Sequence, residues 1–178
     1  KLGAYGCLRV AMTLFPHGLD PWAFKVLGFA SWRDVFGLLA VIGIVYGATV
    51  ALVQKDFKFV IGYSSVSHMG FVLLGLVTLN TIGLSGAVLQ MFTHGISAAA
   101  LFFFAGVLQD RAGGLRDMTA FGGLRKIMPI YAGILGISMF SSLGLPGLNG
   151  FVGEFTILLG AFGSDAIGNP WFAGISAI

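Results

Sequence analysis

Long stretches without any charged residue divide this sequence, and they constrain its fold more than any other feature. Three of them, 35–53, 59–79 and 82–108, contain no Lys, Arg, Asp or Glu. A helix needs about 20 apolar residues to cross the roughly 30 Å hydrocarbon core of a bilayer. Each stretch is therefore long enough to form one membrane-spanning helix.

The composition excludes several other classes of protein. Charged residues make up 10% and hydrophobic residues 57% of the chain, whereas soluble domains average about 25% charged residues. Together with a mean hydropathy of +0.93, this excludes a soluble enzyme, a nucleic-acid-binding protein and a disordered tail. The single cysteine excludes a disulfide framework and a Cys-ligated iron–sulfur cluster.

We therefore expect an all-α, polytopic transmembrane helix bundle surrounded by lipid. The chain begins at Lys1 rather than at a methionine and ends at Ile178 within an apolar run. We expect a single transmembrane domain over residues 1–178 that is incomplete at both ends. Its predicted spans are about 1–15, 35–53, 59–79, 83–108, 129–163 and the start of another at 171–178.

The basic residues of the predicted loops indicate the orientation of these spans. The loops at 54–58 and 109–126 lie on one side and carry six Lys or Arg residues, whereas those at 16–34, 80–81 and 164–170 carry two. Short cytoplasmic loops are enriched in Lys and Arg. The loops at 54–58 and 109–126 are therefore predicted to face the cytoplasm or an equivalent compartment.

The last long apolar run should contain a broken helix. Gly144, Pro146, Gly147 and Gly150 fall within seven residues, and this density of helix breakers does not allow a continuous helix. The pattern predicts two half-helices, about 129–143 and 151–163, with Glu154 in the first turn of the second. Discontinuous helices of this kind mark ion sites in secondary transporters.

Three titratable residues are predicted at about the same depth in the membrane. A helical rise of about 1.5 Å per residue places His68, His94 and Glu154 each about 15 Å from a membrane face, on three different spans. Ionisable residues in a bilayer are costly and are functional candidates by default. Lys1 is predicted between mid-depth and the cytoplasmic face. Arg9 is interpreted as structural because it does not give up its proton in a useful pH range.

Polar residues accompany both histidines. Gln90, Thr93, His94 and Ser97 share one helix face by their spacing, and Ser64, Ser65 and Ser67 crowd the turn that contains His68. Such residues suit a hydrogen-bonded proton path, and the histidine pKa of about 6.5 suits proton exchange. They equally suit interhelical hydrogen bonding. The spacing alone leaves both interpretations open.

Several motifs resemble those of a known family. They are Gly3-Ala4-Tyr5-Gly6 after Lys1, Gln54-Lys55-Asp56-Phe57-Lys58, Tyr63-Ser64-Ser65-Val66-Ser67-His68-Met69-Gly70, the run from Gly86 to Gly95, and the segment from Leu143 to Phe155. This set is similar to the antiporter-like, proton-translocating membrane subunits of respiratory complex I, the NADH–quinone oxidoreductase. The acidic residue at Glu154 resembles subunit M, called chain 4 in mitochondria.

The resemblance implies a fold and a set of roles. The chain would be an excerpt of a 14-helix subunit, from helix 8 to the start of helix 13. Lys1, His68, His94 and Glu154 would form the proton relay, with Ser64, Ser67, Gln90, Thr93 and Ser97 as a supporting polar path. No catalytic residue, redox centre, cofactor or metal is expected in this chain. FMN, iron–sulfur clusters and quinone would belong to partner subunits.

The same resemblance implies partners and a location. The neighbours would be the antiporter-like subunits L and N, in a bacterial inner membrane or the equivalent energy-transducing organelle membrane. Three alternatives remain open from the sequence. They are a subunit of a multi-subunit Mrp-type Na⁺/H⁺ antiporter, a subunit of a membrane-bound hydrogenase, and a membrane scaffold that moves no ions.

Overall fold

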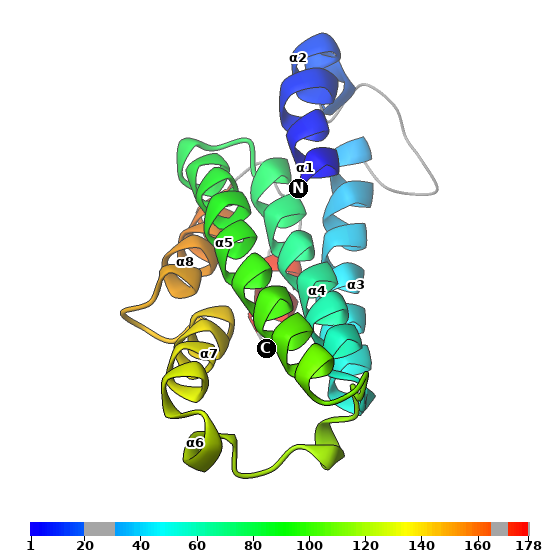
Figure 1. Cartoon of the computed structure of the whole chain (residues 1–178). Helices are drawn as coiled ribbons and strands as arrows, with labels where there is room; N and C mark the ends of the chain where they lie inside the picture. Colours follow the sequence, from blue (N-terminus) through cyan, green and yellow to red (C-terminus); the bar gives the residue numbers. More distant parts are fainter. Residues whose placement is uncertain (20–30, 165–170, 178) are drawn as a thin grey trace.

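Three long helices form the centre of the molecule. The computed structural model describes residues 1–19, 31–164 and 171–177. Helices α3 (Trp32–Val53), α4 (Phe57–Val77) and α5 (Thr81–Arg111) are each long and apolar enough to cross a membrane, and they lie side by side (Figure 1). Among the described residues the regular elements are all helical, which confirms the predicted all-α class.

The first predicted span is helical but irregular. Helix α1 (Leu2–Gly6) continues into a π-helical turn, η1 (Cys7–Ala11), and then into α2 (Met12–Leu14), followed by the short 3₁₀ helix η2 (Pro16–Leu19). This segment packs against Val72 and Leu76 of α4 through Ala4, Cys7, Leu8 and Met12. The π-helical turn surrounds Arg9, where the sequence predicted an ordinary helix.

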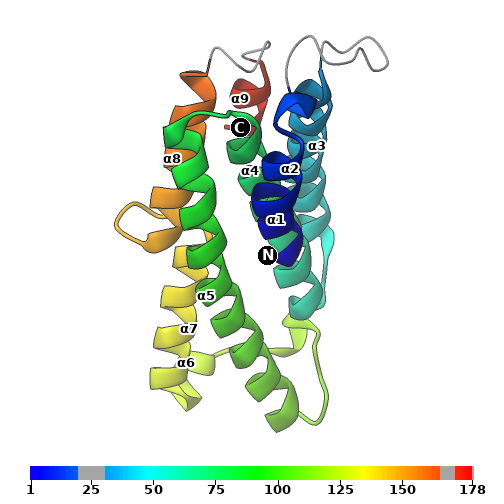
Figure 2. The same ribbon diagram turned by 90° about the horizontal axis from the view of Figure 1, so that it is seen from above.

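The broken helix lies where the sequence predicts it. Helix α7 (Pro129–Ser142) and helix α8 (Asn149–Phe162) follow one another along the side of α5 (Figures 1 and 2). Between them, Gly144 and Gly147 adopt the left-handed backbone conformation, with φ of 70° and 97°. That conformation ends α7, since residues with a side chain rarely adopt it. Two short helices, η3 (Met118–Ala120) and α6 (Leu124–Ile127), precede α7, and α9 (Trp171–Ser176) follows α8.

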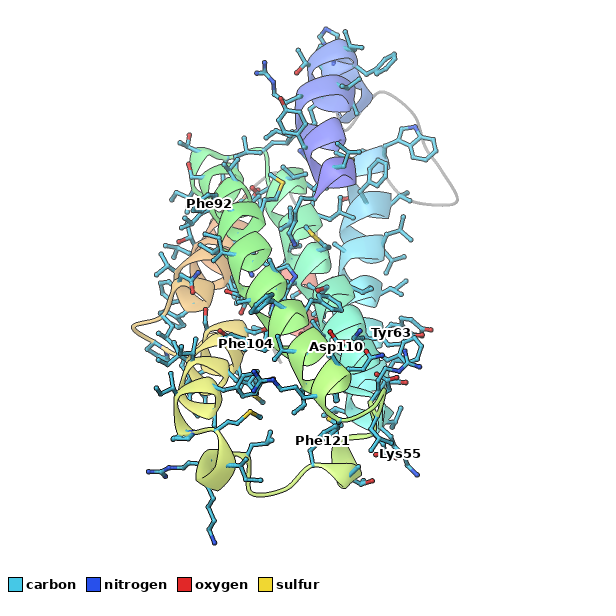
Figure 3. All side chains as sticks on the ribbon, viewed as in Figure 1. Lys55, Tyr63, Phe92, Phe104, Asp110 and Phe121 are labelled. Carbon is cyan, nitrogen blue, oxygen red and sulfur yellow. The ribbon has the colours of Figure 1, made fainter. Side chains whose placement is uncertain are left out.

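The loops meet in the two groups that the alternation of the predicted spans indicated. At one end, the Met118 amide donates to the Lys55 carbonyl at 2.9 Å, and Arg116 pairs with Asp56 at 3.1 Å. Lys55 and Phe121 lie together at this end (Figure 3). At the other end, Asn80 donates to the Gly160 carbonyl at 2.7 Å, and the Ser164 hydroxyl donates to the Thr78 carbonyl at 2.9 Å. These contacts fix the α4–α5 turn against the end of α8.

Small residues allow α8 to approach α5 closely. A Cβ atom added to Gly86 would lie 2.8 Å from the Ile157 amide nitrogen, and one added to Gly153 would overlap the side chain of Gln90. Ile157 is fully buried and belongs to the apolar cluster that joins α3, α4 and α8. The second half-helix is therefore held firmly in the bundle, with its first turns against the middle of α5.

Candidate functional site

Glu154 lies on the second turn of α8, a few residues after the helix break. Because α8 begins at Asn149, Glu154 is its sixth residue, and the prediction that it occupies the first turn is wrong. Leu148 caps the helix with an extended backbone and no side-chain hydrogen bond, and the two residues after it are already helical. The favourable effect of the helix dipole on a carboxylate falls off within the first turn. Direct contacts therefore dominate the surroundings of this carboxylate.

Two N–H groups converge on one oxygen of Glu154. Nδ1 of His68 lies 2.6 Å from Oε1, and Nε2 of Gln90 donates to the same oxygen at 3.0 Å. His68 comes from α4 and Gln90 from α5, so three helices supply this contact. The side chains of His68 and Glu154 are 12% and 19% exposed. A short hydrogen bond between an imidazole and a carboxylate is charge-assisted and stronger than a neutral one.

His68 also connects this contact to His94 and to the end of α7. The imidazole rings of His68 and His94 lie 4.5 Å apart, centre to centre. The other ring nitrogen of His68, Nε2, lies 3.4 Å from the Ser142 hydroxyl, and Nε2 of His94 lies 3.1 Å from the Ser65 hydroxyl. The three residues predicted at a common depth are thus brought together at the helix break.

The polar face of α5 continues this network toward α7. Gln90, Thr93, His94 and Ser97 are all buried. Thr93 donates to Oε1 of Gln90 at 3.3 Å, and the Ser97 hydroxyl lies 3.1 Å from that of Ser141. Ser141 in turn donates to the side-chain oxygen of Asn149, the first residue of α8. The hydroxyl groups therefore link both half-helices to α5.

Three of the predicted residues are not hydrogen-bonded to this network. Within the described part of the chain, no hydrogen bond joins Ser64 or Ser67 to His68 or His94, and the backbone of Ser67 instead packs against α3 at Gly47. The amine of Lys1 lies 3.2 Å from the sulfur of Met69, which follows His68 on α4. Lys1 therefore contacts the residue that follows His68, but no hydrogen bond joins it to either histidine in the described part of the chain.

Three polar residues that flank the break also belong to the site, although they were not predicted as site residues. Ser141, Ser142 and Asn149 contact Ser97, His68 and one another across it. Their signal was present in the sequence, since all three lie within a few residues of Gly144 and Pro146. Of the three serines in the turn before His68, it is Ser65, rather than Ser64 or Ser67, that contacts a histidine.

The glycine at 144 brings the break directly against the carboxylate. A Cβ atom added to Gly144 would lie 2.9 Å from Oε2 of Glu154. Gly147 also has a positive φ but would meet no atom within 4 Å, and Pro146 lies between the two. The break thus serves two purposes, because it ends α7 and it leaves room for the second carboxylate oxygen.

A positive charge on His68 and another on His94 at the same time would cost considerable free energy. Two unit charges 4.5 Å apart, the separation of the ring centres, repel by roughly 4 kcal/mol at an effective dielectric constant of about 20. The same argument gives a strong attraction between an imidazolium at His68 and a carboxylate at Glu154. Chemically, the arrangement can hold one mobile proton whose position depends on the charges around it. No group of three His, Cys, Asp or Glu side chains in the described residues is arranged to bind a metal ion.

Known proteins with this architecture were found by sequence and by structure. Residues 1–177 match the family described as NADH:quinone oxidoreductase/Mrp antiporter, transmembrane. NADH-quinone oxidoreductase subunit M of Rickettsia prowazekii is 43% identical over 91% of this chain and 31% of its own length. The protein of the same name from Pseudomonas aeruginosa is 46% identical over 91% of this chain and 30% of its own length.

A solved structure agrees with these relatives. A chain of respiratory complex I from Thermus thermophilus with bound NADH superimposes with a TM-score of 0.86 and 32% sequence identity. The match covers 99% of this chain and 34% of the other, so the sequence spans about a third of the proteins that it resembles. Its apolar helices and its match to a transmembrane family make it an integral membrane protein. The chain belongs to the NADH:quinone oxidoreductase/Mrp antiporter transmembrane family.

Proposed function

We propose that this chain is part of subunit M of an NADH–quinone oxidoreductase and that it moves protons without redox chemistry of its own. The relatives named above carry that subunit name. The observation that carries the proposal is the contact between His68 and Glu154 at the helix break, 2.6 Å between Nδ1 and Oε1. An ionisable pair inside a bilayer is costly, and function is its usual reason.

In this proposal the relay consists of Lys1, His68, His94 and Glu154. Lys1 would hold a proton near the membrane centre, and the two histidines would pass a single proton between them, because charging both rings is costly. Glu154 would accept that proton, and its affinity would change with the charge on His68. Gln90, Thr93 and Ser97 would support this path through the hydrogen bonds described above. Ser64 and Ser67 would contribute only through water, since no hydrogen bond joins them to the histidines.

The energy for transport would come from other subunits of the complex. FMN, iron–sulfur clusters and quinone are proposed there, and the antiporter-like subunits L and N are the proposed neighbours. The basic loops around Lys55 and Arg116 would face the cytoplasm or an equivalent compartment. The membrane would be a bacterial inner membrane or its organelle counterpart.

The test replaces Glu154 with Gln in the full-length subunit, within the assembled complex. We expect NADH-driven proton uptake by vesicles to fall strongly per electron transferred. The matched control is Asp110→Asn, which makes the same chemical change at an exposed carboxylate near the end of α5 (Figure 3). Unchanged proton stoichiometry in Glu154→Gln, with the complex assembled, would rule out the relay role.

The same vesicles distinguish the second candidate function. The matched family description also covers Mrp antiporters, so exchange of Na⁺ for H⁺ is the alternative activity. Sodium-dependent exchange without NADH would support that alternative. Proton uptake that requires NADH and is indifferent to Na⁺ supports the complex I assignment.

A further inference from the structure

The two oxygens of the Glu154 carboxylate have different surroundings. Oε1 accepts from Gln90 at 3.0 Å and lies 2.6 Å from Nδ1 of His68. Oε2 makes no hydrogen bond to the described residues, and it faces the helix break at Gly144, where an added Cβ would lie 2.9 Å away. One oxygen is therefore held in the bundle, and the other points toward the gap between α7 and α8.

This asymmetry determines where a proton is added most easily. A carboxylate oxygen that already accepts two N–H donors must lose one of them to take a proton. Protonation of Oε2 leaves both hydrogen bonds to Oε1 in place. We infer that Glu154 exchanges its proton at Oε2, toward the helix break, and that Gln90 is a positioning residue that keeps Oε1 turned toward His68. The inference rests on the proposed function. It adds the oxygen atom that takes the proton, the route to that oxygen, and the residue that orients the carboxylate.

The fixed orientation of Gln90 supports this assignment. Its side chain is 1% exposed, and its own oxygen accepts from Thr93 at 3.3 Å. Because an ionised carboxylate can only accept hydrogen bonds, the NH₂ group of Gln90 faces Glu154, and its oxygen is left to face Thr93. The backbone of α8 at Gly153 lies against the same side chain, with no room for a Cβ atom. Gln90 carries no charge and has no proton to exchange, so its contribution is geometric.

Ser142 supplies the route from the histidine pair to Oε2. Nε2 of His68 lies 3.4 Å from the Ser142 hydroxyl, and Ser142 is the last residue of α7, two positions before Gly144. When His68 is doubly protonated, its Nε2–H bond breaks and the proton passes to the Ser142 oxygen. The original hydroxyl proton of Ser142 moves through water in the break and forms the O–H bond at Oε2. His68 ends neutral and keeps its Nδ1–H on Oε1, and Ser142 is unchanged.

The other titratable groups around this route influence the direction in which the proton moves. The ring of His94 lies 4.5 Å from that of His68, tilted by 39°, and a positive charge on His94 disfavours a second one on His68. Lys1 approaches from α1 through Met69 and, when charged, acts in the same sense. Both favour transfer of the His68 proton toward the break rather than its retention.

The first test removes the Ser142 hydroxyl in the full-length subunit of the assembled complex. Ser142→Ala should slow NADH-driven proton uptake by vesicles about a hundredfold, at the low end of the range for a positioned proton-transfer group, and Ser142→Thr should restore most of it. Ser138→Ala is the control, since Ser138 lies one turn earlier on α7 and bonds only to the Ile134 carbonyl. Equal rates in Ser142→Ala and Ser138→Ala would overturn the route.

The second test addresses Gln90 by infrared difference spectroscopy. The carbonyl band of protonated Glu154 is identified by its disappearance in Glu154→Gln. Gln90→Met should shift that band to higher wavenumber, because Oε1, the carbonyl oxygen of the acid, loses a donor. Gln109→Met, on the same helix, should leave it unchanged. An unshifted band in Gln90→Met would overturn the positioning role.

The two proposals fail in different ways. Normal proton stoichiometry in Glu154→Gln refutes the relay itself. If Glu154→Gln loses pumping, while Ser142→Ala has a normal rate of proton uptake and Gln90→Met has an unshifted carbonyl band, the relay role stands. Only proton exchange at Oε2 is then refuted. The rate of NADH oxidation, measured with an uncoupler, shows in every variant that the complex is assembled.

Discussion

Nδ1 of His68 and Oε1 of Glu154 lie 2.6 Å apart, although 86 positions separate the two residues in the chain. The pair joins α4 to the second half of the broken helix, and Gln90 of α5 donates to the same oxygen. A single carboxylate therefore connects three helices at the level of the break. Its contribution to stability and its role in transport are separable by experiment.

Stability is tested by a double-mutant cycle between these two residues. His68→Leu removes a hydrogen-bond partner of the partly buried Glu154, and we expect a loss of about 2 kcal/mol in the free energy of unfolding of the full-length subunit in detergent. The double variant with Glu154→Gln should lose less than the sum of the two single variants. A coupling energy of about 0.5–3 kcal/mol is typical of residues in contact. Additivity within about 0.3–0.5 kcal/mol would contradict a stabilising pair.

The closeness of Gly144 to the carboxylate gives a second prediction. Gly144→Ala and Gly147→Ala both place a side chain at a residue with positive φ, so both should cost about 1 kcal/mol of stability. Only the alanine at 144 also meets Oε2 of Glu154, at 2.9 Å. We therefore expect proton pumping to be impaired in Gly144→Ala and nearly normal in Gly147→Ala, measured as proton uptake per NADH. Equal pumping in the two variants would show that contact with Oε2 is unimportant.

The sequence was sufficient to predict the helices and the break because both depend on local physics. Apolar length determines which segments can span a bilayer, and the glycines and proline of 144–150 cannot extend a helix. Helical spacing likewise predicted that one helix face carries Gln90, Thr93 and His94. The grouping of the loops at the two ends likewise followed from the number of spans between them.

The contacts themselves depended on information that spacing does not contain. The rotation of α4 decides that Ser65 rather than Ser64 meets a histidine, and that rotation is set by the packing of Ser67 against Gly47. The start of α8 at Asn149 moved Glu154 out of the first turn, since Asn149 and Gly150 are helical despite their low helix propensity. The roles of Ser141 and Ser142 depend on the path of the chain through the break, which helical periodicity does not describe.

The loop that joins α5 to α6 should respond to acid. The backbone amide of Thr119 donates to Asp117 at 2.9 Å and its hydroxyl at 2.8 Å, and these bonds hold the pKa of the exposed Asp117 carboxyl below its usual value. A lowered pKa means that the ionised carboxylate stabilises the folded turn. This contribution is complete above the ordinary carboxyl pKa of about 3.9 and is lost as the pH falls through the lower value in the folded turn.

Hydrogen exchange at the Thr119 amide measures this effect. After correction for intrinsic rates, its protection should be constant above about pH 5 and should decrease below about pH 4. In Asp117→Asn the amide oxygen accepts the same bond but does not titrate, so protection should no longer depend on pH in this range. Loss of protection in both proteins at the same pH would assign the effect to another group.

Asn80 is the subject of the last prediction, because its side chain both caps α5 and bonds to α8. Its side-chain oxygen accepts from the Gly83 amide at 2.7 Å and caps α5, while its side-chain nitrogen donates to the Gly160 carbonyl of α8, also at 2.7 Å. Asn80→Ala should remove both and cost about 2 kcal/mol of unfolding free energy. Asn80→Ser keeps a capping oxygen but is too short to reach α8, so it should cost about 1 kcal/mol. If the serine variant were as stable as the original protein, the bond to Gly160 would contribute nothing to holding α8. If it were as unstable as the alanine variant, the cap would contribute nothing, and the bond between the helices would account for the whole effect.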